Sequence, residues 1–487
     1  MNTPVSRRRF LRQANCAAIG SSAVLNALVN LGLANRLAAA DGPVDSKALV
    51  CIFLNGGCDS FNLLVPTDAA RHGVYAASRG AAGTPGGLAL ARESLLPLGA
   101  PAIDLGLHPA CVNLQQMANG TGHFAGKRRL AFVANIGTLV QPVTKAQFKA
   151  WETGKDAALP VPRALFSHSD QIEQWQTAVP QGMQQLSGWA GRAADILHDA
   201  HATGSTSMSI SLDGNNTLQV GNSTQQFVIT PYGALSLARS TAGGAGDPLQ
   251  LKNSGLKDTL GQRYANLLTE SYSRLTRESD ASQEFFQAQF DSAAGNLGPA
   301  VDALFGNDYL ATTLRAVAKT IKLRGALGLR RQTFFLTYGG WDNHAELLNT
   351  ERDLLSGFDA AVGAFQRALE LLGLQDDVVT FTASDFGRTL RSNGLGTDHA
   401  WGGNAMVFGG KVDGGRVLGT YPDLALDGPD DVGLGGRLLP STSVDAYVAE
   451  MLRWFGVPAG SMGYVLPNIA NFWDPNSAKP PLGFMKA

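Results

Sequence analysis

The chain has 487 residues, of which 39 are basic and 40 acidic, so its net charge is close to zero. It contains no basic stripe and no basic patch interleaved with aromatic residues, and we therefore expect no nucleic-acid partner. Apolar residues make up 44 % of the chain, charged residues make up 16 %, and there are 57 glycines. This composition predicts a compact, loop-rich α/β protein rather than a helical bundle.

Residues 1–40 have the features of a twin-arginine export signal. The stretch SRRRFLR at 6–12 is followed by an apolar segment at 14–33 and by three alanines at 38–40, which form a cleavage pattern. Asparagines interrupt the apolar segment, so we expect no permanent membrane anchor. The signal predicts export by the twin-arginine translocase to the periplasm or the exterior. The alternative is a basic arm on a cytosolic protein.

The predicted mature chain, residues 41–487, is expected to form a single domain. The first 40 residues hold five arginines and no acid, which leaves 34 basic and 40 acidic residues and a net charge of −6. Three cysteines remain, too few for a disulfide framework. The twin-arginine route carries folded proteins, many of which take up a metal or cofactor first, so the signal favours a bound cofactor.

Four short apolar runs predict buried strands of a parallel sheet. They lie at 47–54, 130–136, 333–338 and 378–382. Between the last two runs, apolar residues recur at steps of three, four and seven over 347–372, as they do on one face of a helix. Residues 333–383 are therefore predicted to form a βαβ unit, and the fold to be a doubly wound, mostly parallel sheet flanked by helices.

The middle of the chain differs in composition. Residues 203–256 are rich in Gly, Ser, Thr and Asn, and the alternation of Met208, Ile210 and Leu212 predicts a half-exposed strand. We interpret this segment as an insertion or cap on the main sheet. Further helices are predicted at 260–290 and 312–329.

Polar clusters follow three of the predicted strands, at the edge where open α/β sheets bind ligands. They are NGGCDSFN at 55–62, GGWDNH at 339–344 and SDFGRT at 384–389, the last followed by Asn393-Gly394 and Asp398-His399. Glycines let the backbone approach a ligand closely, and carboxylates and imidazoles are ligands for zinc, manganese or calcium. Because all the clusters fall at one edge, we expect a shared site that holds a divalent metal.

A further group, Ser167-His168-Ser169-Asp170, opens a predicted helix. A helix N-terminus stabilises an anion, and a serine there has the chemistry of a metal-activated nucleophile. The alternative is that Ser167 caps the helix and Asp170 completes a capping box. The two roles are compatible.

With these motifs the sequence resembles the domain-of-unknown-function 1501 family, over nearly all of the mature chain and in the right order. The family's recurring segments are GG-x-D-x-x-N, S-H-x-D/E, D-x-H and S-E-FGRT followed by N-G and D-H. They correspond here to Gly56–Asn62, Ser167–Asp170, Asp342–His344, Ser384–Thr389, Asn393-Gly394 and Asp398-His399.

That family is grouped with the alkaline-phosphatase-like superfamily, which includes phosphatases, sulfatases and phosphomutases. The resemblance implies a doubly wound sheet with metal at the strand ends. From the residues themselves, Ser167, His168 and Arg388 are the catalytic candidates. The metal ligands that the resemblance implies are Asp59 or Asn62, then Asp342, His344, Asp398 and His399, and Asp385 for a second ion. Two ions would clamp the attacking and leaving oxygens of an ester.

The sequence departs from this pattern after the fourth strand. Superfamily enzymes commonly have Asp-His there, whereas this chain has Asp385-Phe386, and Asp385 also replaces the Glu more frequent in the family. Arg388 either contacts a phosphate or sulfate group in place of a metal charge or forms a structural ion pair.

The leading hypothesis is an exported hydrolase of phosphate or sulfate esters that uses one or two ions of zinc, manganese or calcium. Its substrate would be a small anionic ester or a polysaccharide. The alternative is a non-catalytic relative that keeps the pocket to bind a ligand or partner, and a third is a metal-dependent enzyme acting on another bond. The G-x-S-x-G and H-E-x-x-H motifs are absent, which disfavours a serine hydrolase or a zincin.

Overall fold

The computed structural model describes residues 45–486 except 100–103, 183–184, 203–205 and 236–247. The predicted export signal at 1–40 lies outside the described residues. The chain folds around one large sheet with the strand order β12-β5-β11-β10-β1-β9-β6-β7-β8, and β13 pairs with β5. Its strands are β1 (Lys47–Asn55), β5 (Leu130–Gly137), β6 (Ser209–Ser211), β7 (Phe227–Thr230), β8 (Gly233–Ala234), β9 (Arg331–Gly339), β10 (Val378–Ser384), β11 (Gly403–Phe408), β12 (Val417–Leu418) and β13 (Thr442–Ser443).

Strands β1, β9 and β10 form the centre of the sheet. β1 pairs in parallel with β10 on one side and with β9 on the other. Among the remaining strands β11 and β8 run antiparallel to their neighbours, so the sheet is mixed but mostly parallel, as predicted. Residues 48–54 of β1 are all buried, because helices cover both faces of the strand, and this explains the uninterrupted apolar run.

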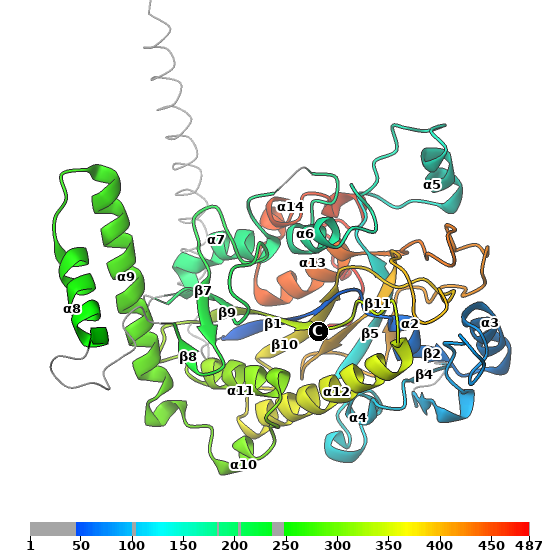
Figure 1. The fold of residues 1–487 in the computed structure, drawn as a ribbon, viewed down its shortest axis with the longest axis horizontal. Coiled ribbons are helices and arrows are strands. Elements are labelled where there is room, and N and C mark those ends of the chain that lie inside the picture. The colour runs from blue at the N-terminus through cyan, green and yellow to red at the C-terminus, as the bar shows by residue number, and fades with distance from the viewer. Residues whose placement is uncertain (1–44, 100–103, 183–184, 203–205, 236–247, 487) are drawn as a thin grey trace, which may run out of the picture.

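Two layers of helices enclose the sheet (Figure 1). One face carries α4 (Val112–Asn119), α11 (Tyr309–Lys322) and α12 (Leu347–Leu371), and the other carries α6 (His168–Thr177), α7 (Trp189–His201) and α13 (Val444–Phe455). The predicted βαβ unit is confirmed, since α12 connects β9 to β10. Its buried residues Phe358, Val362, Phe365 and Leu369 follow the helical period that the sequence indicated.

Residues 203–256 contribute edge strands to the main sheet. β6 pairs in parallel with β9, and β7 with β6, so the described part of this segment continues the sheet. The prediction of a half-exposed strand is wrong, because Ser209 and Ser211 are as fully buried as Met208, Ile210 and Leu212. The strand pairs with β9 and β7 along its edges and contacts α7, and residues on both of its faces are buried.

The other predicted helices are present with shifted ends. The helix expected over 260–290 is α9 (Leu267–Phe290), which begins later than predicted. A separate helix, α8 (Pro248–Gly261), precedes it, and the two project together from the body of the molecule (Figure 1). Asn266 begins α9 by accepting hydrogen bonds from the N–H groups of Leu268 and Thr269. α11 ends at Lys322, earlier than the predicted 329.

The smaller elements complete the fold at its edges. Strands β2 (Leu64–Pro66), β3 (Leu96–Pro97) and β4 (Leu105–Leu107) form a second, antiparallel sheet. The remaining α-helices are α2 (Ser60–Leu63), α3 (Ala69–Arg79), α5 (Lys145–Glu152), α10 (Pro299–Asp302) and α14 (Met462–Val465).

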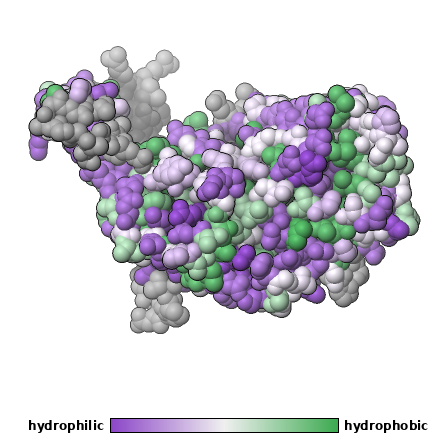
Figure 2. Space-filling model, turned by 60° about the horizontal axis from the view of Figure 1, so that its bottom comes forward, coloured by the Kyte–Doolittle hydropathy of each residue, from purple (hydrophilic) through white to green (hydrophobic). Residues whose placement is uncertain are grey.

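None of the helices within the described ranges is long and apolar enough to cross a membrane. The face seen in Figure 2 is largely hydrophilic, with apolar residues gathered in separate patches. The apolar sides of the covering helices are turned inward instead, as α11 shows by burying Leu310, Leu314, Val317 and Ile321.

Asp445, at the start of α13, is a buried acid with a stability consequence. Burial raises its pKa to about 8, and its Oδ1 atom has no hydrogen-bond partner among the described residues. Between about pH 4 and pH 8 the folded chain therefore holds a proton that the unfolded chain releases, so stability falls as the pH rises. We expect Asp445→Asn to remove this slope and to stabilise the protein at pH 8 by on the order of a few kcal/mol.

The measurement is thermal or urea unfolding at pH 5 and at pH 8, with the exposed Asp258→Asn as the matched control. An unchanged pH slope in Asp445→Asn would show that this carboxyl is ionised in the folded protein.

Candidate metal centre

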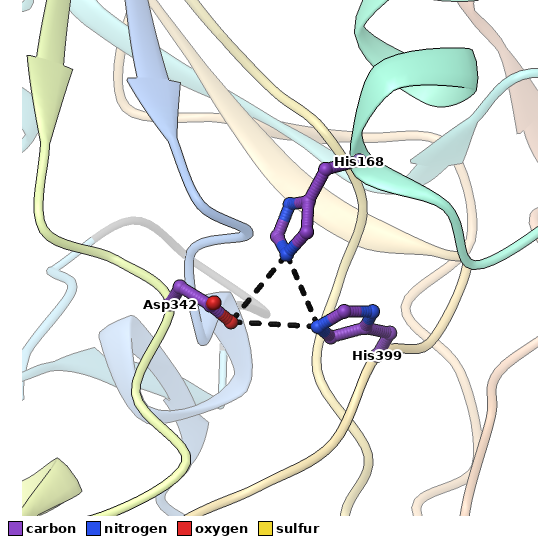
Figure 3. A group of neighbouring side chains, drawn as sticks. All are labelled: His168, Asp342 and His399. Atoms are coloured by element: carbon purple, nitrogen blue, oxygen red, sulfur yellow. Dashed lines mark hydrogen bonds and ion pairs between the residues drawn. The ribbon is translucent and has the colours of Figure 1, made fainter.

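The central strands and one helix bring the predicted site residues to one edge of the sheet. β1 keeps its parallel register with β9 and β10 up to its last residues. The loops that follow β9 and β10 therefore meet, and they carry Asp342 and His399 towards each other. The first turn of α6 lies over the same edge and adds His168 (Figure 3).

Ligand-type atoms converge at the centre of this site. Nε2 of His168 lies 3.1 Å from Nε2 of His399 and 3.5 Å from Oδ1 of Asp342. Nε2 of His399 lies 3.4 Å from the same carboxylate oxygen (Figure 3). His344 adds a fourth atom, because its Nε2 lies 3.0 Å from Asp342 Oδ1 and 3.1 Å from His399 Nε2. The side chain of Asp342 is 48 % exposed, so the centre opens to solvent.

Each of the three imidazoles is held from behind through its Nδ1 atom. The partners are Asp385 Oδ2 for His168 (2.6 Å), Asp398 Oδ1 for His344 (3.3 Å) and the carbonyl oxygen of Phe166 for His399 (2.9 Å). All three partners are hydrogen-bond acceptors, so the proton of each neutral imidazole belongs on Nδ1. The Nε2 atoms then present their lone pairs to the centre, as metal-binding histidines do.

This donor set fits a divalent metal ion. Lone pairs and a carboxylate oxygen that face one another at 3.0–3.5 Å repel unless a cation lies between them. A tetrahedral zinc ion with bonds of 2.0–2.1 Å keeps its ligand atoms about 3.4 Å apart, which agrees with these separations. Imidazole nitrogens suit zinc better than calcium, which takes six to eight oxygens. His168, Asp342 and His399 would hold the ion, with His344 as a fourth ligand.

Two pKa shifts keep the ligand atoms deprotonated near neutral pH. Burial acts to raise the pKa of Asp342, but the hydrogen bond and charge of Arg388 outweigh it and lower that pKa below its ordinary value. Burial lowers the pKa of His399, and the charges of His168 and Arg388 add to this effect. An ionised carboxylate and a neutral imidazole are the forms that bind metal.

The Gly56-Gly57 turn after β1 allows this close assembly. Both glycines have positive φ, +118° and +85°, and the N–H of Gly56 donates to Oδ1 of Asp385 at 3.0 Å. A Cβ atom on Gly56 would lie 2.5 Å from the backbone nitrogen of Asp342, and one on Gly57 would lie 2.6 Å from the Phe386 ring. Any larger residue would push the loops apart.

Phe386 supports the imidazoles. Its ring is buried, with its centroid 4.7 Å from that of His168 and 4.6 Å from that of His399. The ring therefore fixes the planes of two ligands by packing against them.

Arg388 is fully enclosed by protein acceptors. Its Nε donates to the carbonyl of Gly57 (2.9 Å), and its Nη2 donates to the carbonyl of Trp341 (3.1 Å) and to Oδ1 of Asp342 (2.5 Å). Its side chain has no exposed surface. Of its two predicted roles, this geometry favours the structural ion pair over contact with a substrate anion.

Ser167 occupies the N-cap position of α6, but its hydroxyl makes no cap hydrogen bond. It donates instead to Oδ2 of Asp170 at 2.7 Å, and Asp170 also pairs with Arg163 at 3.0 Å. The predicted capping box is wrong, because the two side chains bind each other and not the helix backbone. A nucleophilic role for Ser167 stays a prediction.

Asp59 and Asn62 belong to a different buried network. Asp59 forms an ion pair with Arg79. The amide of Asn62 donates to Oε2 of Glu351 at 3.3 Å and accepts from the hydroxyl of Tyr75 at 2.7 Å. Neither side chain contacts the imidazole cluster, so the structure gives no support for these two residues as ligands of the same ion.

The sequence did not reveal which residues face the centre of the site and which hold the imidazoles through Nδ1. Sequence reasoning gave His168 to catalysis and Asp385 and Asp398 to metal, whereas the structure places His168 among the inner atoms and both aspartates behind imidazoles. It also missed Phe166, which acts through its backbone carbonyl and has a positive φ of +74°. A backbone acceptor leaves no signal in side-chain chemistry.

Asp385→Asn tests the hydrogen bond that Asp385 forms with Nδ1 of His168. The N–H of Gly56 requires an acceptor, so the new amide would turn its oxygen to Gly56 and its NH₂ to Nδ1 of His168. His168 would then carry its proton on Nε2 and lose its lone pair to the centre. We expect zinc affinity to fall about 10- to 100-fold, measured by competition with a chromophoric chelator. Equal affinity in Asp385→Asn and in the exposed control Asp376→Asn would contradict the proposed tautomer.

Comparison with solved structures gives only weak likenesses. Ps i-CgsB shares 10 % identity, with a TM-score of 0.31 over 88 % of this chain and 78 % of that one; in complex with k-i-k-neocarrahexaose the TM-score is 0.30 over 87 % and 72 %. A structure from Bacteroides thetaiotaomicron, described with the metabolism of multiple glycosaminoglycans, shares 12 % identity, with a TM-score of 0.32 over 87 % and 74 %. These scores are too low to carry an argument.

A search of curated proteins finds no match. The sequence model of one family, described as "Protein of unknown function (DUF1501)", matches residues 46–432, which include the whole imidazole cluster and its supporting loops. The chain therefore belongs to the domain-of-unknown-function 1501 family.

Proposed function

We propose that this protein is an exported, metal-dependent hydrolase of phosphate or sulfate esters. The observation that carries the proposal is the convergence of three imidazole Nε2 atoms on one oxygen of Asp342, with an acceptor behind every Nδ1 atom. Because the cluster lies at a solvent-exposed edge, its geometry favours a metal-binding role over a role in stabilising the core.

The fold supports the same proposal. Helices cover both faces of a mostly parallel sheet, and the cluster lies outside the carboxyl ends of its central strands. This is where open α/β sheets bind ligands. We interpret the architecture as doubly wound and alkaline-phosphatase-like, and the twin-arginine signal at 1–40 as the address that sends the mature chain to the periplasm or the exterior.

A single ion accounts for the donors that are present. Both oxygens of Asp385 are occupied, by His168 and by the N–H of Gly56, and Asp59 is paired with Arg79. A second ion would have to displace one of these partners. The bound ion would supply Lewis-acid polarisation of an ester oxygen and a lowered pKa for a water molecule.

The chain's own groups would position the ester around the ion. The exposed sides of Asp342 and His344, 48 % and 44 %, leave the centre open to a substrate. α6 begins at His168, and the first N–H groups of a helix, together with its dipole, attract an anion such as a phosphate or sulfate group.

Two observations favour the alternative of a non-catalytic, ligand-binding protein. The hydroxyl of Ser167 is bound to Asp170, and Phe386 stands where superfamily enzymes commonly have an imidazole. Metal analysis combined with assays on phosphate and sulfate esters separates the two hypotheses.

The proposal is tested by elemental analysis of the mature chain from Asp41, followed by assays on aryl phosphate and aryl sulfate esters. We expect about one equivalent of zinc or manganese, and ester hydrolysis that is lost in the Asp342→Ala, His399→Ala double variant. Asp258→Asn serves as the control, because its exposed side chain lies on α8, away from the site.

A protein that is folded by circular dichroism, contains no metal and takes up none would overturn the metallohydrolase proposal. Bound metal without activity on either ester class would instead favour the non-catalytic alternative.

A further inference from the structure

An open cavity beside the metal centre has no role in the mechanism described so far. Its volume is about 700 Å³, within the usual range for ligand pockets. It shares three elements with the centre. Asn55 ends β1 directly before Gly56, Thr337 lies near the end of β9, and Gln176 lies on α6.

α6 connects the cavity to the metal centre along one face. His168, Ile172 and Gln176 are spaced by four residues, so their side chains lie on the same side of the helix. The first is in the metal cluster and the other two line the cavity. A substrate whose ester group lies at the metal therefore has this cavity beside it.

The chemistry of the lining is polar and almost uncharged. Among the described residues that line the cavity, seven are Asn or Gln, and Asp213 is the only one that carries a charge. Phe53, Phe335 and Ile172 give the cavity an apolar floor. Because no lysine or arginine of the described residues lines the cavity, it does not suit a phosphate or sulfate group.

Several of these polar side chains have donors or acceptors that are available to a ligand. Oε1 of the buried Gln176 accepts the N–H groups of Thr217 and Leu218 at 2.9 and 3.1 Å, which fixes the amide and leaves its NH₂ as a donor. Among the described residues no hydrogen bond involves the side chains of Asn55, Gln225 or Thr337. The cavity thus offers donors and acceptors together.

The loop that walls the cavity is itself rigid. The amide of Gln226 accepts from the N–H of Asn216 at 3.2 Å and donates to the side chain of Asn215 at 2.9 Å. Asn216 in turn donates to Gln219 at 3.0 Å. A pre-formed wall lowers the entropy cost of binding.

We propose that this cavity is a subsite for an uncharged sugar unit of the ester substrate. Hydroxyl groups both donate and accept hydrogen bonds, as primary amides do, and the C–H faces of a sugar ring suit an apolar floor. The inference rests on the proposed ester hydrolase and narrows its substrate class to sugar esters, with the anionic ester at the metal and the sugar ring in the cavity.

The test is calorimetric titration of the mature, metal-loaded protein with cellotetraose, maltotetraose and galactotetraose, and with tetraglycine as a peptide probe. At least one sugar is expected to bind at millimolar concentration or below. The Gln225→Ala, Thr337→Val double variant should weaken that binding roughly tenfold, because two hydrogen bonds are lost. Gln262→Ala, an exposed glutamine outside the cavity, is the matched control.

The outcomes separate this inference from the proposed function. Sugar binding that persists in the metal-free Asp342→Ala, His399→Ala variant, without any ester hydrolysis by the native protein, supports the subsite and contradicts the hydrolase. Ester hydrolysis without binding of any sugar overturns the subsite alone. Equal sugar binding by the cavity double variant, or binding of tetraglycine in place of sugars, also overturns it.

Discussion

The parallel pairing of β1 with both β9 and β10 is the constraint on which the rest of the site depends. Three strands in one direction end at one edge, and this brings residues 329 positions apart in the sequence, Gly56 and Asp385, into contact. The pairing continues to Leu54 and Ser384 on one side and to Asn55 and Gly339 on the other. The next residues are Gly56, Asp385 and Gly340, and the first two form a hydrogen bond. The metal cluster is thus a direct continuation of the sheet ladder.

The electrostatics of the cluster follow from that placement. Asp385 is fully buried and holds a backbone N–H and an imidazole, while Arg388 is fully buried and holds Asp342. Each buried charge therefore has partners that offset the cost of its desolvation. The Nε2 atoms of the three histidines have no such partner, because each imidazole carries its proton on Nδ1 and directs the lone pair of Nε2 to the centre of the site. The fold holds these lone pairs close to one another, and their mutual repulsion would be removed by a bound cation. In this way the protein pre-organises a metal site.

The sequence sufficed for the sheet and for the residues that gather at its edge. Fully buried parallel strands have a plain signature, and the polar clusters that follow them must meet at one edge. The sequence did not suffice for the direction of each side chain. Asp59 and Asp385 each follow a central strand, yet one turns to Arg79 and the other to His168. The strand at 209–211 was misread because its serines are small enough to be buried beside other strands. Tertiary packing, which leaves no periodic pattern, decides such cases.

The shared face of α6 couples two tasks that are otherwise separate. His168 lies at its start and Gln176 near its end, and the buried Trp175 packs the helix against the core between them. A shift of the helix would move the metal ligand and the cavity donor together. The cavity wall formed by residues 213–226 contributes none of the metal ligands, although Gln219 in this wall donates to Thr333 of β9. Substitutions in that wall can therefore change which sugar binds while the metal ligands keep their geometry. This separation of specificity from metal binding is expected when variable loops are placed on a rigid sheet.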